Sequence, residues 1–158
     1  MKKFRSFGFL LVSLCLSAAT AVVADAQTVS GYIGNGTAAR GKTTRSAVVL
    51  SIPGGLHVNS NRPDSEYSIP TAVTVTAAGG ASAGRVTYPR GKNKKFQFSP
   101  NTINIYEGRV VFPFSLTIPR GFKGNVVRVT ARVRFQACTD EVCYPPRTET
   151  VTLSARVR

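Results

Sequence analysis

The sequence predicts an all-β protein, an immunoglobulin-like antiparallel β-sandwich, and three observations favour this class. Apolar and polar residues alternate with a period of two along several segments, as in half-buried strands. Clusters of Gly, Pro, Asn and Asp interrupt these segments at short intervals. No window shows the 3.6-residue periodicity of an amphipathic helix. A sandwich of many short strands accounts for all three.

The clearest strands lie near the C-terminus. Every second residue of segment 127–135 is apolar, while Arg128, Arg132 and Arg134 alternate with them, so this strand should have a basic outer face. Residues 150–157 alternate in the same way. Pro113 lacks a backbone N–H and indicates an edge strand or a bulge. Further strands are predicted, in chain order, at residues 47–52, 56–59, 72–77, 85–88, 102–106 and 110–118, with turns at 53–55, 61–64, 78–80, 90–93 and 120–124.

The N-terminus predicts export. Basic residues at positions 2, 3 and 5 precede an apolar run over residues 7–23, and the small residues near Ala26 form a cleavage site. We therefore expect residues 1–26 to be a signal peptide, and the mature protein to be periplasmic or secreted without a membrane span. Residues 27–45, rich in Gly, Thr and Ala, are expected to form a loose N-terminal lead. Residues 46–158 should form the sandwich.

The chain is strongly basic. It has 158 residues, of which 21 are Lys or Arg and 7 are Asp or Glu. Removal of residues 1–26, which include three basic residues and one acidic residue, leaves 132 residues with a net charge of +12. This length fits one monomeric domain with its own core. The charge favours an anionic partner or simply maintains solubility, and no nucleic-acid signature is present.

Cys138 and Cys143 are the two cysteines of the processed chain. They bracket a four-residue loop between two predicted strands, so they can bond without moving either strand. Closing so small a ring stabilises the fold by only about 2 kcal/mol. The pair is therefore either a structural staple or an exchange site, at which a partner's thiolate attacks one of the sulfurs. The spacing does not decide between them, nor does it show which cysteine is attacked first.

Other chemistry has less support. Two thiols and His57, the only histidine, are a weak ligand set even for Cu(I), so we expect neither a metal nor a cofactor. No Ser, His and Asp grouping suggests hydrolysis. Asp140 and Glu141 are adjacent on the cysteine loop, where they either solvate the loop or raise the pKa of the thiols by repulsion.

The cysteine segment resembles a known family. The run FQACTDEVCYPP at residues 135–146, followed by TETV at 148–151, is similar to the active-site segment of the N-terminal periplasmic domain of the thiol:disulfide interchange protein DsbD. The segments GLHVNSN at 55–61, IPT at 69–71 and IYEG at 105–108 also fit this family in order and spacing. The resemblance covers residues 46–157.

The resemblance implies an immunoglobulin-like sandwich whose Cys138 and Cys143 relay reducing equivalents to other proteins outside the cytoplasm. Well-known members have five residues between the cysteines, whereas this chain has four. Those members continue into a membrane-spanning electron carrier and a thioredoxin-like domain, so here we expect redox partners of these two kinds to be separate proteins. Whether such a relay makes the protein an enzyme, a protein-disulfide reductase, stays open.

The resemblance also implies residues that shape the site. His57 and Asn59 occupy the strand positions facing the cysteines, and Tyr144 follows the second cysteine. An imidazolium at His57 would lower a thiol pKa, whereas the alternative is a solvent-exposed strand histidine. Phe96 and Phe98 are candidates for an aromatic cap over the disulfide, or they are ordinary core residues on one strand face. The alternative function is a non-catalytic, disulfide-stapled sandwich that binds a partner protein or an anionic envelope component.

Overall fold

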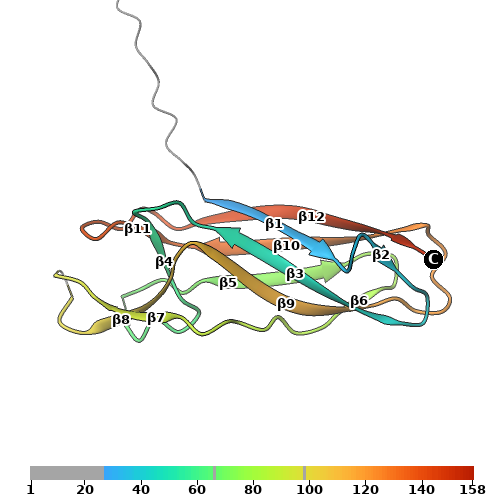
Figure 1. The fold of residues 1–158 in the computed structure, drawn as a ribbon, viewed down its shortest axis with the longest axis horizontal. Helices are drawn as coiled ribbons and strands as arrows, with labels where there is room; N and C mark the ends of the chain where they lie inside the picture. The colour runs from blue at the N-terminus through green and yellow to red at the C-terminus, as the bar shows by residue number, and fades with distance from the viewer. Residues whose placement is uncertain (1–26, 66, 98) are drawn as a thin grey trace, which may run out of the picture.

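The computed structural model describes residues 27–65, 67–97 and 99–158, and these residues contain strands and no helix (Figure 1). The predicted signal peptide and Phe98 lie outside the described residues. No described segment forms a helix long and apolar enough to cross a bilayer. The strands are β1 Thr28–Ile33, β2 Thr37–Ala38, β3 Thr43–Ser51, β4 His57–Asn59, β5 Ala72–Ala77, β6 Ser82–Ala83, β7 Lys92–Lys95, β8 Thr102–Tyr106, β9 Arg109–Thr117, β10 Val126–Phe135, β11 Ala137–Cys138 and β12 Arg147–Val157.

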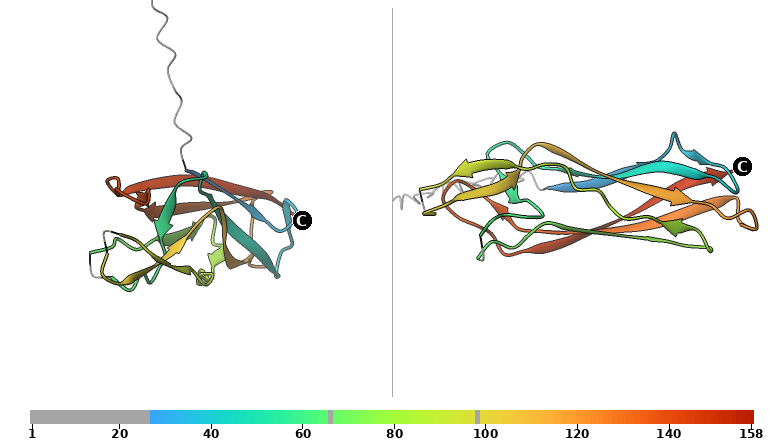
Figure 2. Two further views of the ribbon diagram at one scale, coloured as in Figure 1. Left: turned by 60° about the vertical axis from the view of Figure 1, so that its left-hand side comes forward. Right: turned by 90° about the horizontal axis from the view of Figure 1, so that it is seen from below.

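Two four-stranded sheets pack face to face along the long axis of the molecule (Figures 1 and 2). The first has the order β1-β3-β9-β6, and the second has the order β2-β12-β10-β5. Nearly all pairings are antiparallel; β2 pairs with β12 in parallel. The all-β class and the immunoglobulin-like sandwich predicted from the sequence are confirmed.

The core forms where the alternating apolar residues of the two sheets meet. Strand β10 alternates between exposed and buried residues along its whole length, because its even-numbered residues face outward. Strands β9 and β12 bury their apolar residues in the same manner. The largest fully buried side chains come from both sheets and include Leu50, Phe112, Leu116, Ile118, Val129 and Phe135. The period-two pattern therefore predicted the inward face of each long strand correctly.

A third, smaller sheet lies at one end of the sandwich and positions the cysteines. Its order is β11-β4-β8-β7, and Figure 1 shows it at the end opposite the C-terminus. The first of its strands, β11, continues the chain from β10 after Gln136, so the end of a long core strand fixes Cys138. Because β4 pairs with β11 on one side and β8 on the other, the cysteine strand is held by long-range contacts.

The prediction of a loose lead over residues 27–45 is wrong. Strand β1 pairs with β3 from Thr28 opposite Ser51 to Ile33 opposite Ser46, and β2 adds to the second sheet. The Gly-rich composition has a packing reason here. A Cβ atom at Gly31 would collide with the Ala47 carbonyl oxygen and the methyl groups of Leu153, so glycine lets β1 approach both sheets.

The remaining differences concern short elements. Residues 85–88 were predicted as a strand, but they run beside β9 with only isolated hydrogen bonds, such as Thr87 N–H to Pro113 O at 2.8 Å. Lys92–Lys95 begins in a predicted turn and instead forms β7, which pairs with β8. Pro113 lies opposite Ala47 of β3, and the neighbouring β6 pairs only with Leu116 and Thr117. Pro113 therefore lies beyond the end of β6, as the missing N–H requires.

Candidate functional site

Cys138 and Cys143 form a disulfide that closes a short hairpin. Their Cα atoms are 4.0 Å apart, and the two residues form an isolated β-bridge. Inside the loop, Thr139 N–H donates to Val142 O at 2.8 Å, and the Thr139 hydroxyl accepts from the N–H groups of Glu141 and Val142. The Tyr144 N–H donates to Ala137 O at 2.8 Å just outside the bond. Backbone hydrogen bonds therefore support the loop on both sides of the disulfide.

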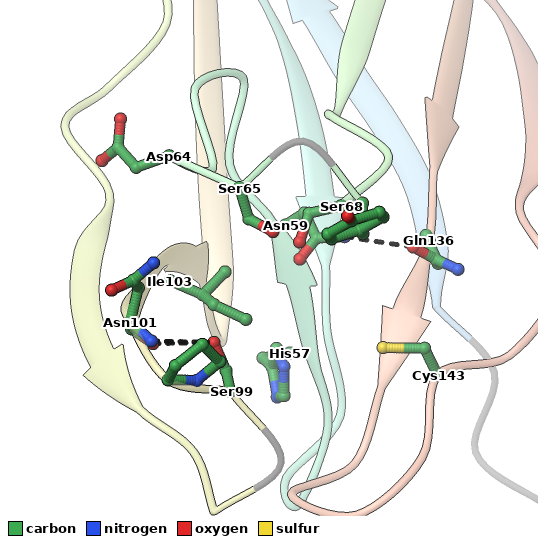
Figure 3. Close-up of a pocket in the computed structure, with 12 residues that line it drawn as sticks. His57, Asn59, Asp64, Ser65, Ser68, Ser99, Asn101, Ile103, Gln136 and Cys143 are labelled. Carbon is green, nitrogen blue, oxygen red and sulfur yellow. Dashed lines mark hydrogen bonds between the residues drawn. The ribbon is translucent and has the colours of Figure 1, made fainter.

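The two sulfur-bearing residues differ sharply in exposure. Cys138 is fully buried, whereas Cys143 is exposed. Cys138 lies opposite His57 in the pairing of β11 with β4, which covers it. Cys143 instead lines a pocket of about 450 Å³, and Figure 3 shows its sulfur directed toward this space (Figure 3). Only one side of the disulfide is therefore open to an approaching group.

The pocket beside Cys143 is lined by small polar side chains together with Tyr67, Pro100 and Ile103, and most of its exposed lining is apolar. Two segments far apart in the sequence form its walls, one around Ser65 and Ser68 and the other around Ser99 and Asn101. His57, Asn59 and Gln136 form the part nearest the disulfide. Asp64 also lines it and has a φ of 60°, a left-handed conformation that Asp adopts more readily than most residues. The pocket thus offers hydrogen-bonding groups next to the accessible sulfur.

His57 is buried, and it lies between the disulfide hairpin and Phe96. Only 2% of its surface is exposed, so the alternative of a solvent-exposed strand histidine is wrong. Its ring stacks on Phe96 with centroids 4.6 Å apart. Burial lowers the pKa of His57, the Lys94 ammonium lowers it further, and Asp140 and Glu107 oppose these effects. The imidazole is therefore mostly neutral near pH 7, which argues against an imidazolium that activates a thiol.

This lowered pKa predicts a pH dependence of stability. A histidine in the unfolded chain has a pKa of about 6.5, so the unfolded state binds the proton more readily than the folded state. The contribution of neutral His57 is fully present above that value and is lost as the pH falls through the lower folded pKa. We expect urea unfolding between about pH 7.5 and 5.5 to show falling stability on acidification.

The His57→Phe variant provides the control, because a phenyl ring can keep the stack on Phe96. His57 is the only histidine, and most carboxylates titrate at lower pH, so this variant should show a flatter pH profile in that window. An unchanged slope would mean that another group causes the pH dependence.

Lys94 connects β7 to the cysteine loop. Its ammonium donates a hydrogen bond to Asp140 Oδ1 at 3.0 Å and lies 3.5 Å from Glu107 Oε1. The hydrogen bond to Asp140 raises the pKa of Lys94. The ammonium also lies 5.3 Å from the centroid of the Phe96 ring. Asp140 was predicted either to solvate the loop or to raise the thiol pKa; here its charge is partly balanced by Lys94.

Asn59 and Gln136 form a second connection behind the disulfide. Asn59 Nδ2 donates to Ile69 O at 3.1 Å and to Gln136 Oε1 at 3.2 Å. Gln136 Nε2 donates to Tyr144 O at 3.2 Å. The Gln136 side chain therefore joins Asn59 of β4 to both arms of the cysteine hairpin. A hydrogen-bond network in which each group has a partner makes the site rigid.

The structure brings most of the predicted site residues together. His57, Asn59, Phe96 and Cys138 are buried around the hairpin, while Tyr144 is half exposed beside it. Phe96 packs on His57, and it also packs with Ile103 and Ile105 in a small satellite core. It therefore has features of both a residue that shapes the site and an ordinary core residue. Phe98 lies outside the described residues. Sequence reasoning missed Lys94 and Gln136, although the position of Gln136 two residues before the first cysteine was a usable signal.

Comparisons with known proteins identify a family and proteins of similar fold. The family described as thiol:disulfide interchange protein DsbD, N-terminal, matches residues 34–155. The reduced N-terminal domain of DsbD from Neisseria meningitidis is 16% identical, with a TM-score of 0.45, over 70% of this chain and 77% of that one. The N-terminal periplasmic domain of ScsB from Proteus mirabilis is 13% identical, with a TM-score of 0.53, over 85% of this chain and 49% of that one. Comparison with curated proteins finds no match.

The match to this family, together with the disulfide hairpin at one end of the sandwich, places the chain in the class of thiol:disulfide interchange modules. The family match extends over most of the chain. The chain belongs to the family of the N-terminal domain of the thiol:disulfide interchange protein DsbD, and the predicted resemblance is confirmed.

Proposed function

We propose that Cys138 and Cys143 are the redox site of this module and that partner proteins react first at Cys143. The observation that carries this proposal is the difference in exposure: Cys143 is exposed and lines an open pocket, and Cys138 is fully buried. Thiol–disulfide exchange requires a thiolate to reach one sulfur. An incoming thiolate can reach Cys143 without opening the pairing of β11 with β4.

The exchange then proceeds in two steps. A thiolate of a donor dithiol attacks Cys143 Sγ, the Cys138–Cys143 bond breaks, and Cys138 leaves as a thiolate that takes up a proton. The donor's second thiolate then attacks its own sulfur in the mixed disulfide and releases Cys143 as a thiolate, which is protonated in turn. The donor is oxidised to a disulfide, and the pair is reduced by two electrons. With an oxidised acceptor protein the same steps run in reverse, and Cys138 resolves the mixed disulfide.

The surrounding residues support this role by holding the hairpin in place. The Asn59–Gln136 network and the Lys94–Asp140 bond fix the loop from two sides, so Cys143 can react while the backbone stays ordered. Tyr144 and Val142 are apolar groups left partly exposed beside the sulfur, suited to contact with a partner. We infer that the donors and acceptors are thioredoxin-like proteins or a membrane electron carrier, and that the module acts in the periplasm or outside the cell.

The reduction potential of the pair tests this function. The purified protein would be equilibrated with glutathione redox buffers, and its thiols would be quantified by alkylation. We expect a potential within the range of exchange proteins, above about −300 mV, because the bond is accessible and closes only a small ring. A potential well below that value would identify a structural bond that resists reduction, and would support the non-catalytic, stapled sandwich instead.

A further inference from the structure

The outer face of the second sheet carries a row of arginines among hydroxyl groups. Arg128, Arg132 and Arg134 point outward from β10, and Arg156 points outward from β12. The pairing places Arg128 beside Ser154, Arg132 between Thr150 and Thr74, and Arg134 beside Thr148. We call this surface the arginine face; its other exposed strand residues are Ala72, Thr76, Val126, Thr130 and Thr152.

The guanidinium groups of this face have no partner in the part of the chain that the structure describes. Arg128, Arg132, Arg134 and Arg156 form no ion pair and no side-chain hydrogen bond with any described residue. The strand positions that make up the face contain neither Asp nor Glu. In contrast, the described carboxylates lie toward the disulfide: Asp64 in the pocket, Asp140 and Glu141 on the loop, Glu107 on Lys94 and Glu149 on Arg147. The described carboxylates therefore gather at the disulfide end, and none of them lies on the arginine face.

The chemistry of the arginine face fits an array of phosphates better than a protein surface. Specific protein interfaces depend on buried aromatic and large apolar anchors, and the only apolar side chains here are Val126 and Ala72. At a rise of about 3.3 Å per residue, Arg132 and Arg134 are about 7 Å apart along β10, and Arg128 lies about 13 Å from Arg132. Short Thr and Ser side chains lie between them and supply further hydrogen-bond donors.

We propose that the arginine face binds the anionic phosphate headgroups of a lipid bilayer surface. The guanidinium fork pairs with phosphate oxygens through two parallel hydrogen bonds, and an anionic membrane attracts each basic residue near its surface. Binding through this face lays the long axis of the sandwich along the membrane, because β10 and β12 run lengthwise (Figure 1). The disulfide hairpin, at the end of the same sheet, stays at the edge of the contact and open to partners.

The test uses flotation of the purified protein with vesicles. Vesicles of equal parts phosphatidylglycerol and phosphatidylcholine are compared with vesicles of phosphatidylcholine alone. We expect binding to the anionic vesicles at about 0.05 M salt and its loss at about 0.5 M salt, where screening extends only a few ångströms. In the R128Q/R132Q/R134Q variant, the affinity should fall about a hundredfold, because each arginine near the surface contributes about a fivefold effect.

The matched control removes the same charge elsewhere. R45Q/R85Q/R109Q takes three exposed arginines from outside the arginine face, two of them on β3 and β9 of the opposite sheet, and should retain binding within about threefold. Thr152→Glu places a carboxylate on the face without removing an arginine, and it should also weaken binding. This variant tests the proposal even if the triple variant does not fold. Equal losses in both triple variants, no binding to anionic vesicles at low salt, or selective binding to an acidic protein instead would overturn the proposal. Thiol exchange with a soluble dithiol should stay unchanged in every variant.

Discussion

Cys143→Ser is expected to abolish thiol:disulfide exchange, whereas Cys138→Ala should still form a mixed disulfide with a partner. The reason is the geometry of the hairpin: Cys143 borders the open pocket, and Cys138 is covered by β4. With Cys138 removed, and with a partner that lacks its own resolving cysteine, no thiol remains to attack the mixed disulfide, so the intermediate at Cys143 should accumulate. The reduced variants react with a thioredoxin-like protein whose single remaining active-site cysteine carries a thionitrobenzoate leaving group, and non-reducing gel electrophoresis measures the trapped species.

The reciprocal result would contradict this assignment. If Cys143→Ser traps a partner through Cys138 and Cys138→Ala does not, the pairing of β11 with β4 must open during exchange, and the buried sulfur must be the point of attack. Val126→Ala is a suitable control, because it changes an exposed side chain at the start of β10, away from both sulfurs. Combined with Cys138→Ala, it should form the mixed disulfide to the same extent as Cys138→Ala alone.

Phe135→Ala is expected to destabilise the protein by about 3–5 kcal/mol, the cost of truncating a fully buried aromatic residue. Phe135 ends β10, and the Arg147 guanidinium lies 5.2 Å from its ring centroid. The resulting cavity lies three residues before Cys138, so the loss should also loosen the cysteine hairpin. The total free energy of unfolding of a typical domain is only about 5–15 kcal/mol, so the expected loss is a large fraction of it. Urea unfolding with linear extrapolation measures the change.

Val126→Ala gives the matched comparison for this experiment. Val126 begins the same strand with 42% of its surface exposed, and its truncation should change the free energy of unfolding by no more than about 0.5 kcal/mol. A loss below about 1 kcal/mol for Phe135→Ala would mean that the end of β10 is less tightly packed than its burial indicates.

The sequence predicted β8, β9, β10 and β12 well and missed β1, β6 and β7, for physical reasons. Residues 127–135 and 150–157 each present a complete alternation, and one inward-facing set of side chains defines the buried face. Strands β6 and β7 have two and four residues, and their pairing with β9 and β8 determines them more than their own side chains do. Strand β1 was missed because Gly31 weakens the strand pattern. Glycine occurs there because β1 passes too close to Ala47 and Leu153 for a Cβ atom to fit.

The candidate site divides in the same way. The cysteine pair and its flanking residues are contiguous, so their pattern was visible in the chain, as were His57 and Asn59 on the facing strand. Lys94 is 46 residues from Asp140 in sequence, and Asn59 is 77 residues from Gln136. No local pattern indicates such pairs, because the folding of β4, β7 and β8 around the hairpin brings them together.

The amino-acid sequence by itself determined the all-β class, the orientation of the long strands, the basic outer face of β10 and which two cysteines can form the disulfide, because each depends on residues near one another in the chain. Only the tertiary structure decided which sulfur is accessible, that His57 is buried and mostly neutral, and that the arginines of β10 lie among hydroxyl groups without a partner among the described residues. Those properties depend on burial and on cross-strand register, which arise when distant strands pair and pack.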